Sequence, residues 1–245
     1  MKISAQKKEK IPPSWGDDQL SAFIENAAGN IYASFHNLKP QFNLLKDIHL
    51  VFDSIVQNLD RTPEWFASFF LFRSHAAFLG AVRLALSGAI PESYMVLRGC
   101  LENAFYGFYL YDDKERQETW LRRHDDQKSK AKMRSEFTIG KVLGFMKTKD
   151  KALHKISKDL YERTIDLGGH PNEKAFFSVV KQKKDKSKIT FDSAYLIGNE
   201  PALQLAIKSS AQIGICSLSI FEKIYEKRFQ ILGLSDRINR LKQGL

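Results

Sequence analysis

The sequence predicts an all-α fold, a helical bundle with a small β-hairpin insertion near residues 176–195. Three observations support this prediction. Apolar residues recur three and four positions apart along most of the chain, as on helices that bury one face. Two neighbouring segments, 63–86 and 91–111, are apolar nearly all round, so we expect them at the centre of the bundle. A hydrophobic content of 43% over 245 residues provides the side chains for a substantial core.

The N-terminal part begins with residues 1–16, which are rich in Lys. We expect a mobile basic arm there, followed by a single α-helical domain over residues 17–245. The first helix should begin after Asp17-Asp18, because acidic side chains suit a helix N-terminus, and Pro40 should end that segment. A second helix is predicted by the next apolar stripe, which consists of Phe42, Leu45, Ile48, Val51, Phe52 and Ile55.

The two central helices have clear boundary signals. Thr62-Pro63-Glu64 provides a capping residue, a proline at the first helical position and an acid for the third helix. Gly88 ends that helix and Pro91 opens the fourth. Because only a short link joins them, we expect the two helices to form an antiparallel hairpin.

The following segments are more polar. We expect a charged amphipathic helix over residues 112–126, a basic segment over 128–150, and a further helix over 151–167 that ends at Gly168-Gly169. The pairs Asp112-Asp113 and Asp125-Asp126 fall at probable helix ends, where they are expected to act as solvated caps rather than metal ligands.

The apolar period changes near residue 176. Residues 176–180 and 189–195 flank the run KQKKDKSK, which predicts a hairpin with a basic tip. A long helix is then expected over residues 200–229, and a short basic helix after Ser235-Asp236.

Composition bears on partners and location. The 38 Lys and Arg against 28 Asp and Glu give a formal charge of +10, which favours nucleic acid first and an acidic membrane surface next. The alternative is a basic surface that serves only solubility. Cys100 and Cys216 have no metal-binding spacing, so we expect buried free thiols in a reducing compartment. With no apparent signal peptide and no uncharged apolar run of about 18 residues, we expect a cytoplasmic protein without a membrane span.

The fourth helix carries two charges in an apolar surrounding. Arg98 and Glu102 are four residues apart, so they share a face and can pair. His75 and Arg83 of the third helix could reach the same layer across the hairpin. We therefore predict an interior polar cluster of His75, Arg83, Arg98 and Glu102. Its role is either a buried ion pair that fixes helix register, or a polar pocket in the bundle.

A second candidate site lies at the end of the 151–167 helix. His170 stands between two glycines and Pro171, and Arg163 lies seven residues earlier. A histidine can move protons near neutral pH, and an arginine can hold a phosphate through a charged transition state. Together they would suit metal-independent RNA cleavage. The alternative is a locally bonded His170 and a solvated Arg163.

Positive charge is concentrated in two stretches that could follow a nucleic-acid backbone. The alternative is a solvated Lys-rich surface. No GxxxxGK[ST], GxGxxG, HExxH or GxSxG motif is present, so we expect no metal and no nucleotide cofactor. The predicted nucleic-acid-binding residues are Lys128, Lys130, Lys132, Arg134, Lys181, Lys183 and Lys184.

The runs FRSHAAFLGAVRLALSGAIPESYMVLRGCLENAFYGFYLY, WLRRHDD and YERTIDLGGHPN, within residues 72–172, resemble a family of uncharacterised prokaryotic helical proteins. That family is similar to the HEPN superfamily of helical-bundle ribonucleases, which act in toxin and antiviral systems, dimerise, and have Arg, four to six residues, then His. Arg163 and His170 match this spacing at its upper limit, although Thr164 follows the arginine where the superfamily usually has Asn, Asp or His.

The resemblance implies a ribonuclease or RNA-binding effector that forms a homodimer, with a protein antitoxin as a further partner. Arg163 would hold the scissile phosphate and His170 would transfer protons. The alternative function is a non-catalytic helical module that binds a protein partner or a small ligand.

Overall fold

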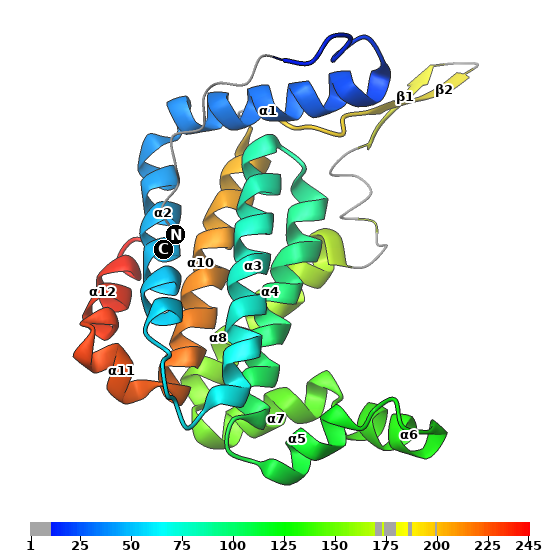
Figure 1. Cartoon of the computed structure of the whole chain (residues 1–245). Coiled ribbons are helices and arrows are strands. Elements are labelled where there is room, and N and C mark those ends of the chain that lie inside the picture. Colours follow the sequence, from blue (N-terminus) through cyan, green and yellow to red (C-terminus); the bar gives the residue numbers. More distant parts are fainter. Residues whose placement is uncertain (1–10, 170–172, 174–179, 186–187, 199) are drawn as a thin grey trace.

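The fold is a helical bundle, seen in Figure 1 of a computed structural model that describes residues 11–169, 173, 180–185, 188–198 and 200–245. Its helices are α1 (Gln19–Asn37), α2 (Lys39–Gln57), α3 (Trp65–Ser87), α4 (Ile90–Leu110), α5 (Lys114–Leu121), α6 (Gln127–Glu136), α7 (Ile139–Lys149), α8 (Lys151–Thr164), α10 (Pro201–Ile224), α11 (Glu226–Ile231) and α12 (Leu234–Leu241). Helices α3, α4 and α10 pack together along the centre. Helix α1 crosses one end, and α5, α6 and α7 lie at the other. The all-α class is confirmed.

Acidic side chains cap several of these helices. Asp18 accepts hydrogen bonds from the first backbone N–H groups of α1, and Asp150 does the same for α8. Asp113 and Asp126 cap α5 and α6. Such caps satisfy N–H groups that have no partner within the helix. The expected start of the first helix and the capping role of the second aspartate in each pair are therefore confirmed.

The turn between α3 and α4 requires a glycine. Gly88 has a φ of 87°, which L side chains rarely adopt, and a Cβ there would lie 2.3 Å from the carbonyl oxygen of Ile197. The Gly88 carbonyl accepts a hydrogen bond from the Ile197 N–H at 3.0 Å. Pro91 sits in the first turn of α4. The predicted antiparallel hairpin is confirmed, and its turn also holds the chain just before α10.

Helix α3 is buried on one side only. Phe66, Leu71 and Phe78 are in the core, whereas Phe69 and Phe72 are 54% and 44% exposed. The expectation that this helix would be buried nearly all round was wrong, because α1, α2, α4 and α10 cover only part of its surface. Among the described helices, α3 is also the one whose length and apolar composition would suffice to cross a membrane.

Small residues let α10 approach its neighbours. A Cβ on Gly214 would lie 2.7 Å from the Phe78 ring. Ser74, Cys100 and Ser217 form a buried chain, in which the Cys100 sulfur lies 3.3 Å from the Ser74 Oγ and 3.4 Å from the Ser217 Oγ. Cys100 and Cys216 are both free and buried, as the sequence predicted.

The end of α8 docks on the start of α4. The backbone continues beyond α8 as η1 (Ile165–Gly169), which leaves helical geometry at Gly168 (φ 176°, ψ −26°) and packs against α4. A Cβ on Gly168 would lie 2.1 Å from the carbonyl oxygen of Pro91. The segment after α8 can therefore come this close only because residue 168 has no side chain.

Two short strands occupy the segment where the sequence predicted a hairpin. Strand β1 (Val180–Asp185) pairs antiparallel with β2 (Lys188–Ser193), from Val180 opposite Ser193 to Asp185 opposite Lys188. Residues 176–179 lie outside the described residues.

Two segments singled out in the sequence each form two helices in the structure. The basic 128–150 segment forms α6 and α7, which Phe137 and Thr138 separate. The 200–229 helix ends at Ile224, and α11 starts two residues later. Tyr225, at this break, is buried and donates a hydrogen bond to the Glu64 carbonyl at 3.1 Å. This long-range contact lies at the break between α10 and α11.

Candidate functional site

Arg163 is the sequence-predicted residue with the most unusual surroundings. It lies in the last turn of α8, half-buried, and its Nη1 donates to the Gln212 Oε1 at 2.5 Å and to the Ser209 Oγ at 3.3 Å. The Tyr94 hydroxyl also donates to the Ser209 Oγ, at 3.1 Å. Within the described residues no carboxylate forms an ion pair with Arg163. The guanidinium is thus held in place by neutral oxygens, and no neighbouring carboxylate among the described residues offsets its positive charge.

Arg163 lies at one end of a groove between α8 and α10. The groove has a volume of about 610 Å³, within the usual range for small-molecule sites. Its apolar lining includes Leu153, Ile156, Leu160 and Ile215. At the opposite end, the Lys223 Nζ lies 3.0 Å from a carboxylate oxygen of Asp150.

Ser219, which also lines this groove, has an unusual hydroxyl. Its side chain is buried, with 7% of the residue exposed, and its Oγ has no hydrogen-bond partner in the described structure. Most buried polar groups are hydrogen-bonded, since an unpaired hydroxyl costs free energy. The Oγ itself has almost no accessible surface, so it does not offer a hydrogen-bonding group to the open groove.

The neighbouring thiol of Cys216 is not a nucleophile. Its sulfur lies 3.4 Å from the Ser157 Oγ, and burial raises its pKa to about 11. The thiol therefore stays protonated at neutral pH, and the only groups in the groove that carry charge are its acids and its Lys and Arg side chains.

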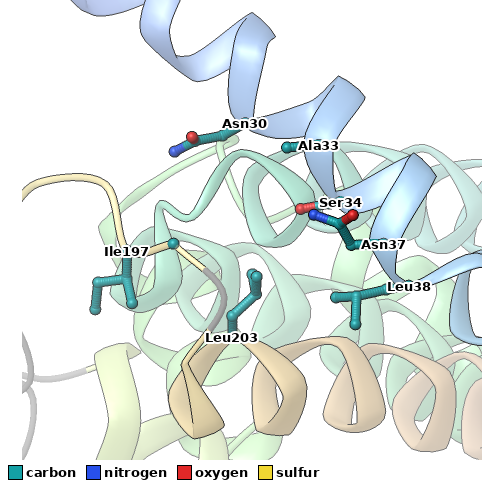
Figure 2. Close-up of a pocket in the computed structure, with 8 residues that line it drawn as sticks. Asn30, Ala33, Ser34, Asn37, Leu38, Ile197 and Leu203 are labelled. Atoms are coloured by element: carbon teal, nitrogen blue, oxygen red, sulfur yellow. The ribbon is translucent and has the colours of Figure 1, made fainter.

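A second hollow lies where α1 crosses the start of α10, lined by residues that include Asn30, Ser34, Ile197 and Leu203 (Figure 2). Its volume is about 30 Å³, far below the usual range for small-molecule sites. It is too small for an organic ligand.

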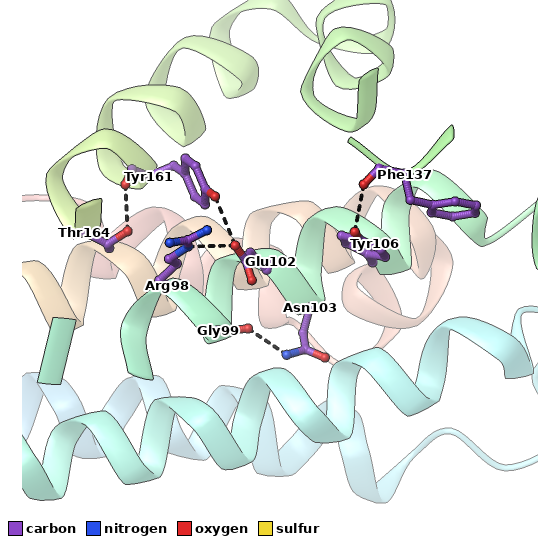
Figure 3. Close-up of polar contacts among 8 residues, drawn as sticks. All are labelled: Arg98, Gly99, Glu102, Asn103, Tyr106, Phe137, Tyr161 and Thr164. Carbon is purple, nitrogen blue, oxygen red and sulfur yellow. Dashed lines mark hydrogen bonds and ion pairs between the residues drawn. The ribbon is translucent and has the colours of Figure 1, made fainter. Parts of the chain in front are cut away.

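The predicted contact between Arg98 and Glu102 is present, but the two side chains are not buried. The Arg98 Nε lies 2.8 Å from the Glu102 Oε1, and the side chains are 27% and 36% exposed. Tyr161 of α8 completes the cluster by donating to the same oxygen at 3.0 Å (Figure 3). Burial, and then the Glu102 charge, raise the pKa of Tyr161 to about 12. The placement in the interior was wrong because this side of α4 faces α8 at the edge of the bundle.

The other two members of the predicted interior cluster lie elsewhere. Arg83 is exposed on α3. His75 meets His49 of α2, with the His49 Nδ1 and the His75 Nε2 2.9 Å apart. The grouping of His75, Arg83, Arg98 and Glu102 was therefore wrong, because one helical hairpin presents different faces to α2, to solvent and to α8.

The remaining predicted residues are only partly placed. His170 lies outside the described residues. Lys181, Lys183 and Lys184 belong to β1, of which the backbone alone is described. Lys128, Lys130, Lys132 and Arg134 are on α6, where only Met133 is buried. Within the described residues, no three His, Cys, Asp or Glu side chains gather as a metal site.

Comparisons of the chain with family models, curated proteins and solved structures found no match.

Sequence reasoning missed the α10 side of the groove. Ser209, Gln212 and Ser219 are three of several polar residues in α10. Gln212 and Ser219 are seven residues apart, two helical turns, and so lie on one face. This spacing was the available signal, although nothing in it identifies α8 as the opposing wall.

Proposed function

We propose that the protein is an RNA-binding effector whose main contact surface is formed by α6, α7 and the first half of α8. The observation that supports this is the distribution of charge. Residues 128–158 contain ten Lys and Arg but only two acids, Glu136 and Asp150, so this segment accounts for a net eight of the formal +10 charge. Charge of one sign at this density favours a polyanion.

The cations of this segment are available for binding. Lys130 is partly exposed and the other nine are exposed. In the described part of the chain none of them forms an ion pair, so the fold itself makes little use of their charge. Helices α6 and α7 lie together at one end of the bundle (Figure 1). Lys181, Lys183 and Lys184 of β1 are included in the proposal as a second basic stretch.

The proposal extends to cleavage. By resemblance to the HEPN superfamily, Arg163 would hold the scissile phosphate and His170 would transfer protons, without a metal, in a homodimeric cytoplasmic toxin or defence protein controlled by a protein antitoxin. The support for Arg163 is its position in an open groove with no carboxylate partner among the described residues. Such a guanidinium can bind a phosphate without first breaking an ion pair.

Binding is tested by charge reversal. The triple variant Lys128→Glu, Lys132→Glu, Arg134→Glu should bind single-stranded RNA at least about tenfold more weakly at physiological salt. The matched control is Lys46→Glu, Lys208→Glu, Lys227→Glu, which changes the net charge equally at exposed lysines elsewhere. Equal weakening in both variants would show that net charge, and not this surface, governs binding.

Cleavage is tested separately. Total RNA is incubated with the protein in EDTA, beside Arg163→Gln and His170→Ala. Cleavage by the parent alone supports the assignment, whereas equal residual cleavage by all three proteins removes both residues from the mechanism.

A second candidate function is a non-catalytic module that binds a small ligand or a protein partner. The groove between α8 and α10, with its apolar lining and Arg163 at one end, favours this candidate. RNA binding without any cleavage, together with a ligand in the groove, would favour it over the nuclease.

A further inference from the structure

We propose that the outer face of α3 is the docking surface for an acidic amphipathic helix of a protein partner. The proposal goes beyond RNA binding, because this face lies on a different helix from the lysines of α6, and it holds whether or not the protein cleaves RNA. The outer face consists of the exposed residues of α3, which are Trp65, Phe69, Phe72, Arg73, Ala76, Leu79 and Arg83.

These residues form one stripe along the helix. From one exposed position to the next the spacing is three or four residues, apart from the adjacent pair Phe72 and Arg73, so they share a side of α3. The rings of Trp65 and Phe69 pack edge to face, with 5.9 Å between their centroids. Trp65 and Arg83 are 18 residues apart, five helical turns or about 27 Å. The stripe therefore runs along the bundle toward the end that α1 crosses (Figure 1) and is long enough for a whole helix.

The apolar part of the face is extensive. Trp65, Phe69 and Phe72 are 57%, 54% and 44% exposed, and Leu79 is 43% exposed. Because an aromatic side chain has about 150–250 Å² to bury, these four leave roughly 400 Å² of apolar surface in water. Apolar patches of this size are often functional, and a polar rim is typical of protein and membrane interaction sites.

The charge of the partner follows from the two arginines of the face. Arg73 and Arg83 are exposed, and neither forms an ion pair with a residue that the structure describes. The sequence of α3 contains no acid. Arginines beside an apolar patch are favoured at protein interfaces, where carboxylates of a partner can pair with them. The outer face thus complements an acidic partner.

The same charges disfavour a second copy of the chain on this face. Two α3 helices brought together would place arginines near each other, with no acid from either helix between them. Like charges across an interface cost free energy, whereas an acidic partner gains from both arginines.

The arrangement of Arg83 also favours a protein over a lipid surface. Phe66, Leu71 and Phe78 on the opposite side of α3 pack in the core, so only the outer face is open to a partner. Arg83 lies on the same line of the helix as Trp65, because five full turns separate them. In an apolar lipid layer its charge would lack a partner, whereas a docked helix can present an acid there.

The spacing of the arginines defines the pattern of the partner helix. Arg73 and Arg83 are ten residues apart, or about 15 Å along α3. Acids about ten positions apart on a helix that lies along α3 would reach both guanidiniums. Apolar residues three and four positions apart on that helix would cover the aromatic part of the face.

Two synthetic peptides test the proposal in titrations of the full chain. The acidic peptide is an amphipathic helix of about 18 residues, with leucines three and four positions apart and two glutamates ten positions apart beside them. The control peptide has lysines in place of the glutamates. The acidic peptide should bind at one site, and at least about tenfold more tightly than the control. Neither peptide contains tryptophan, so burial of Trp65 should shift the protein's fluorescence to shorter wavelength, and Trp65→Phe should remove most of that shift.

The apolar contact is tested by a double variant. Phe69→Gln with Phe72→Gln should weaken the acidic peptide at least about tenfold. The matched control is Ile156→Gln with Leu205→Gln, which removes apolar side chains that are 53% and 45% exposed on α8 and α10 and should bind like the parent. Ala76→Glu places an acid in the middle of the face at an exposed position and should also weaken the acidic peptide, which provides an answer if the phenylalanine variant does not fold.

The charge contact is tested in the same way. Arg73→Gln with Arg83→Gln should reduce the difference between the two peptides to less than about threefold. Lys158→Gln with Lys208→Gln removes the same charge from exposed positions on α8 and α10 and should leave the difference intact. Failure of the acidic peptide to bind the parent, or equal effects of either double variant and its control, would overturn the proposal.

The other possible occupants of the face give different results. By sedimentation, the Phe69 and Phe72 variant should keep the oligomeric state of the parent. A dimer that this variant dissociates would assign the face to a second copy and overturn the proposal. Binding to vesicles of phosphatidylglycerol and phosphatidylcholine that the same variant loses, with no binding of the acidic peptide, would assign the face to a lipid surface and overturn it as well.

The outcome is separable from that of the RNA proposal. The titrations contain no RNA, and the Lys128, Lys132 and Arg134 triple variant should bind the acidic peptide like the parent. Loss of peptide binding in that variant would place the peptide on α6 and contradict the outer face of α3 as its site.

Discussion

The Nδ1 atom of His49 lies 2.9 Å from the Nε2 atom of His75, across the interface between α2 and α3. The His75 ring also stacks on Phe52, with the two ring planes 4° apart. Burial, and then the charge of His49, lower the pKa of His75 to about 4, against the opposing influence of Asp53. The His75 ring is therefore neutral at physiological pH, and which of the two nitrogens donates depends on the tautomers of the rings.

This contact predicts that the folded protein loses stability in acid. An unfolded His75 takes up its proton near pH 6.5, whereas the folded residue resists until about pH 4. Between these values the unfolded state binds more protons, so the free energy of unfolding should fall as the pH is lowered from 6.5 to 4, and then level off for this group. We expect a contribution of about 1–2 kcal/mol, reduced because the ring is partly exposed.

Urea unfolding between pH 7.5 and pH 4 measures this effect. His75→Gln keeps a hydrogen-bonding side chain but does not titrate, so its stability should fall less over the same range than that of the parent. Identical pH dependence in the two proteins would contradict the assignment.

The partly exposed position of the Arg98–Glu102 pair predicts a small energetic role. Glu102→Ala should lower the free energy of unfolding by about 1 kcal/mol, because water can solvate the Arg98 charge that remains. A pair in the interior would instead cost about 3–5 kcal/mol. Thermal melts distinguish these values. Tyr161→Phe, which removes the hydroxyl that donates to the same carboxylate, should cost less than Glu102→Ala.

The contact of Gly168 with the Pro91 carbonyl predicts a strong effect from one added methyl group. Gly168→Ala should destabilise the protein by about 2 kcal/mol or more, since the backbone of η1 must move away from α4. Gly144 in α7 is the control, because a Cβ there would meet nothing within 4 Å. Gly144→Ala should be neutral or stabilising by up to about 1 kcal/mol. Similar losses of stability for both variants in urea unfolding would contradict the close approach.

Replacing Ser219 should affect stability differently from replacing a serine whose hydroxyl is hydrogen-bonded. Ser219→Ala removes a buried hydroxyl that has no partner in the described structure, so it should leave stability unchanged or raise it by up to about 1 kcal/mol. Ser74→Ala removes a hydroxyl that donates to the Cys100 carbonyl at 3.0 Å and should cost about 1 kcal/mol. Both values come from the same urea experiment. A clear loss of stability in Ser219→Ala would mean that the hydroxyl has a partner in the folded protein.

The parts of the fold that were predictable depend on local chemistry. Asp18 and Asp126 cap helices because an acid at that position satisfies nearby N–H groups, and Gly88 ends α3 because the turn needs its φ. Arg98 and Glu102 meet because residues four apart share a helix face. Each of these relationships spans only a few residues of sequence.

The parts that sequence reasoning missed depend on distant contacts. Arg163 is held by Ser209 and Gln212, which are 46 and 49 residues away. Tyr225, at the break between α10 and α11, bonds to Glu64, 161 residues away. Whether a face of α4 is buried depends likewise on how α8 docks. A spacing pattern shows which residues share a helix face, but not which helix covers that face.

Both ends of the connection between η1 and α10 are held close to the turn between α3 and α4. Gly88 bonds to Ile197, and Gly168 approaches Pro91, so the polypeptide leaves the bundle and rejoins it at a single turn. Because the entropy of closing a loop grows only slowly with its length, the connection between these two points can be lengthened or trimmed at small thermodynamic cost. Insertions in this connection, away from the His170 and β1 lysines that the proposed function uses, should therefore leave the helices in place.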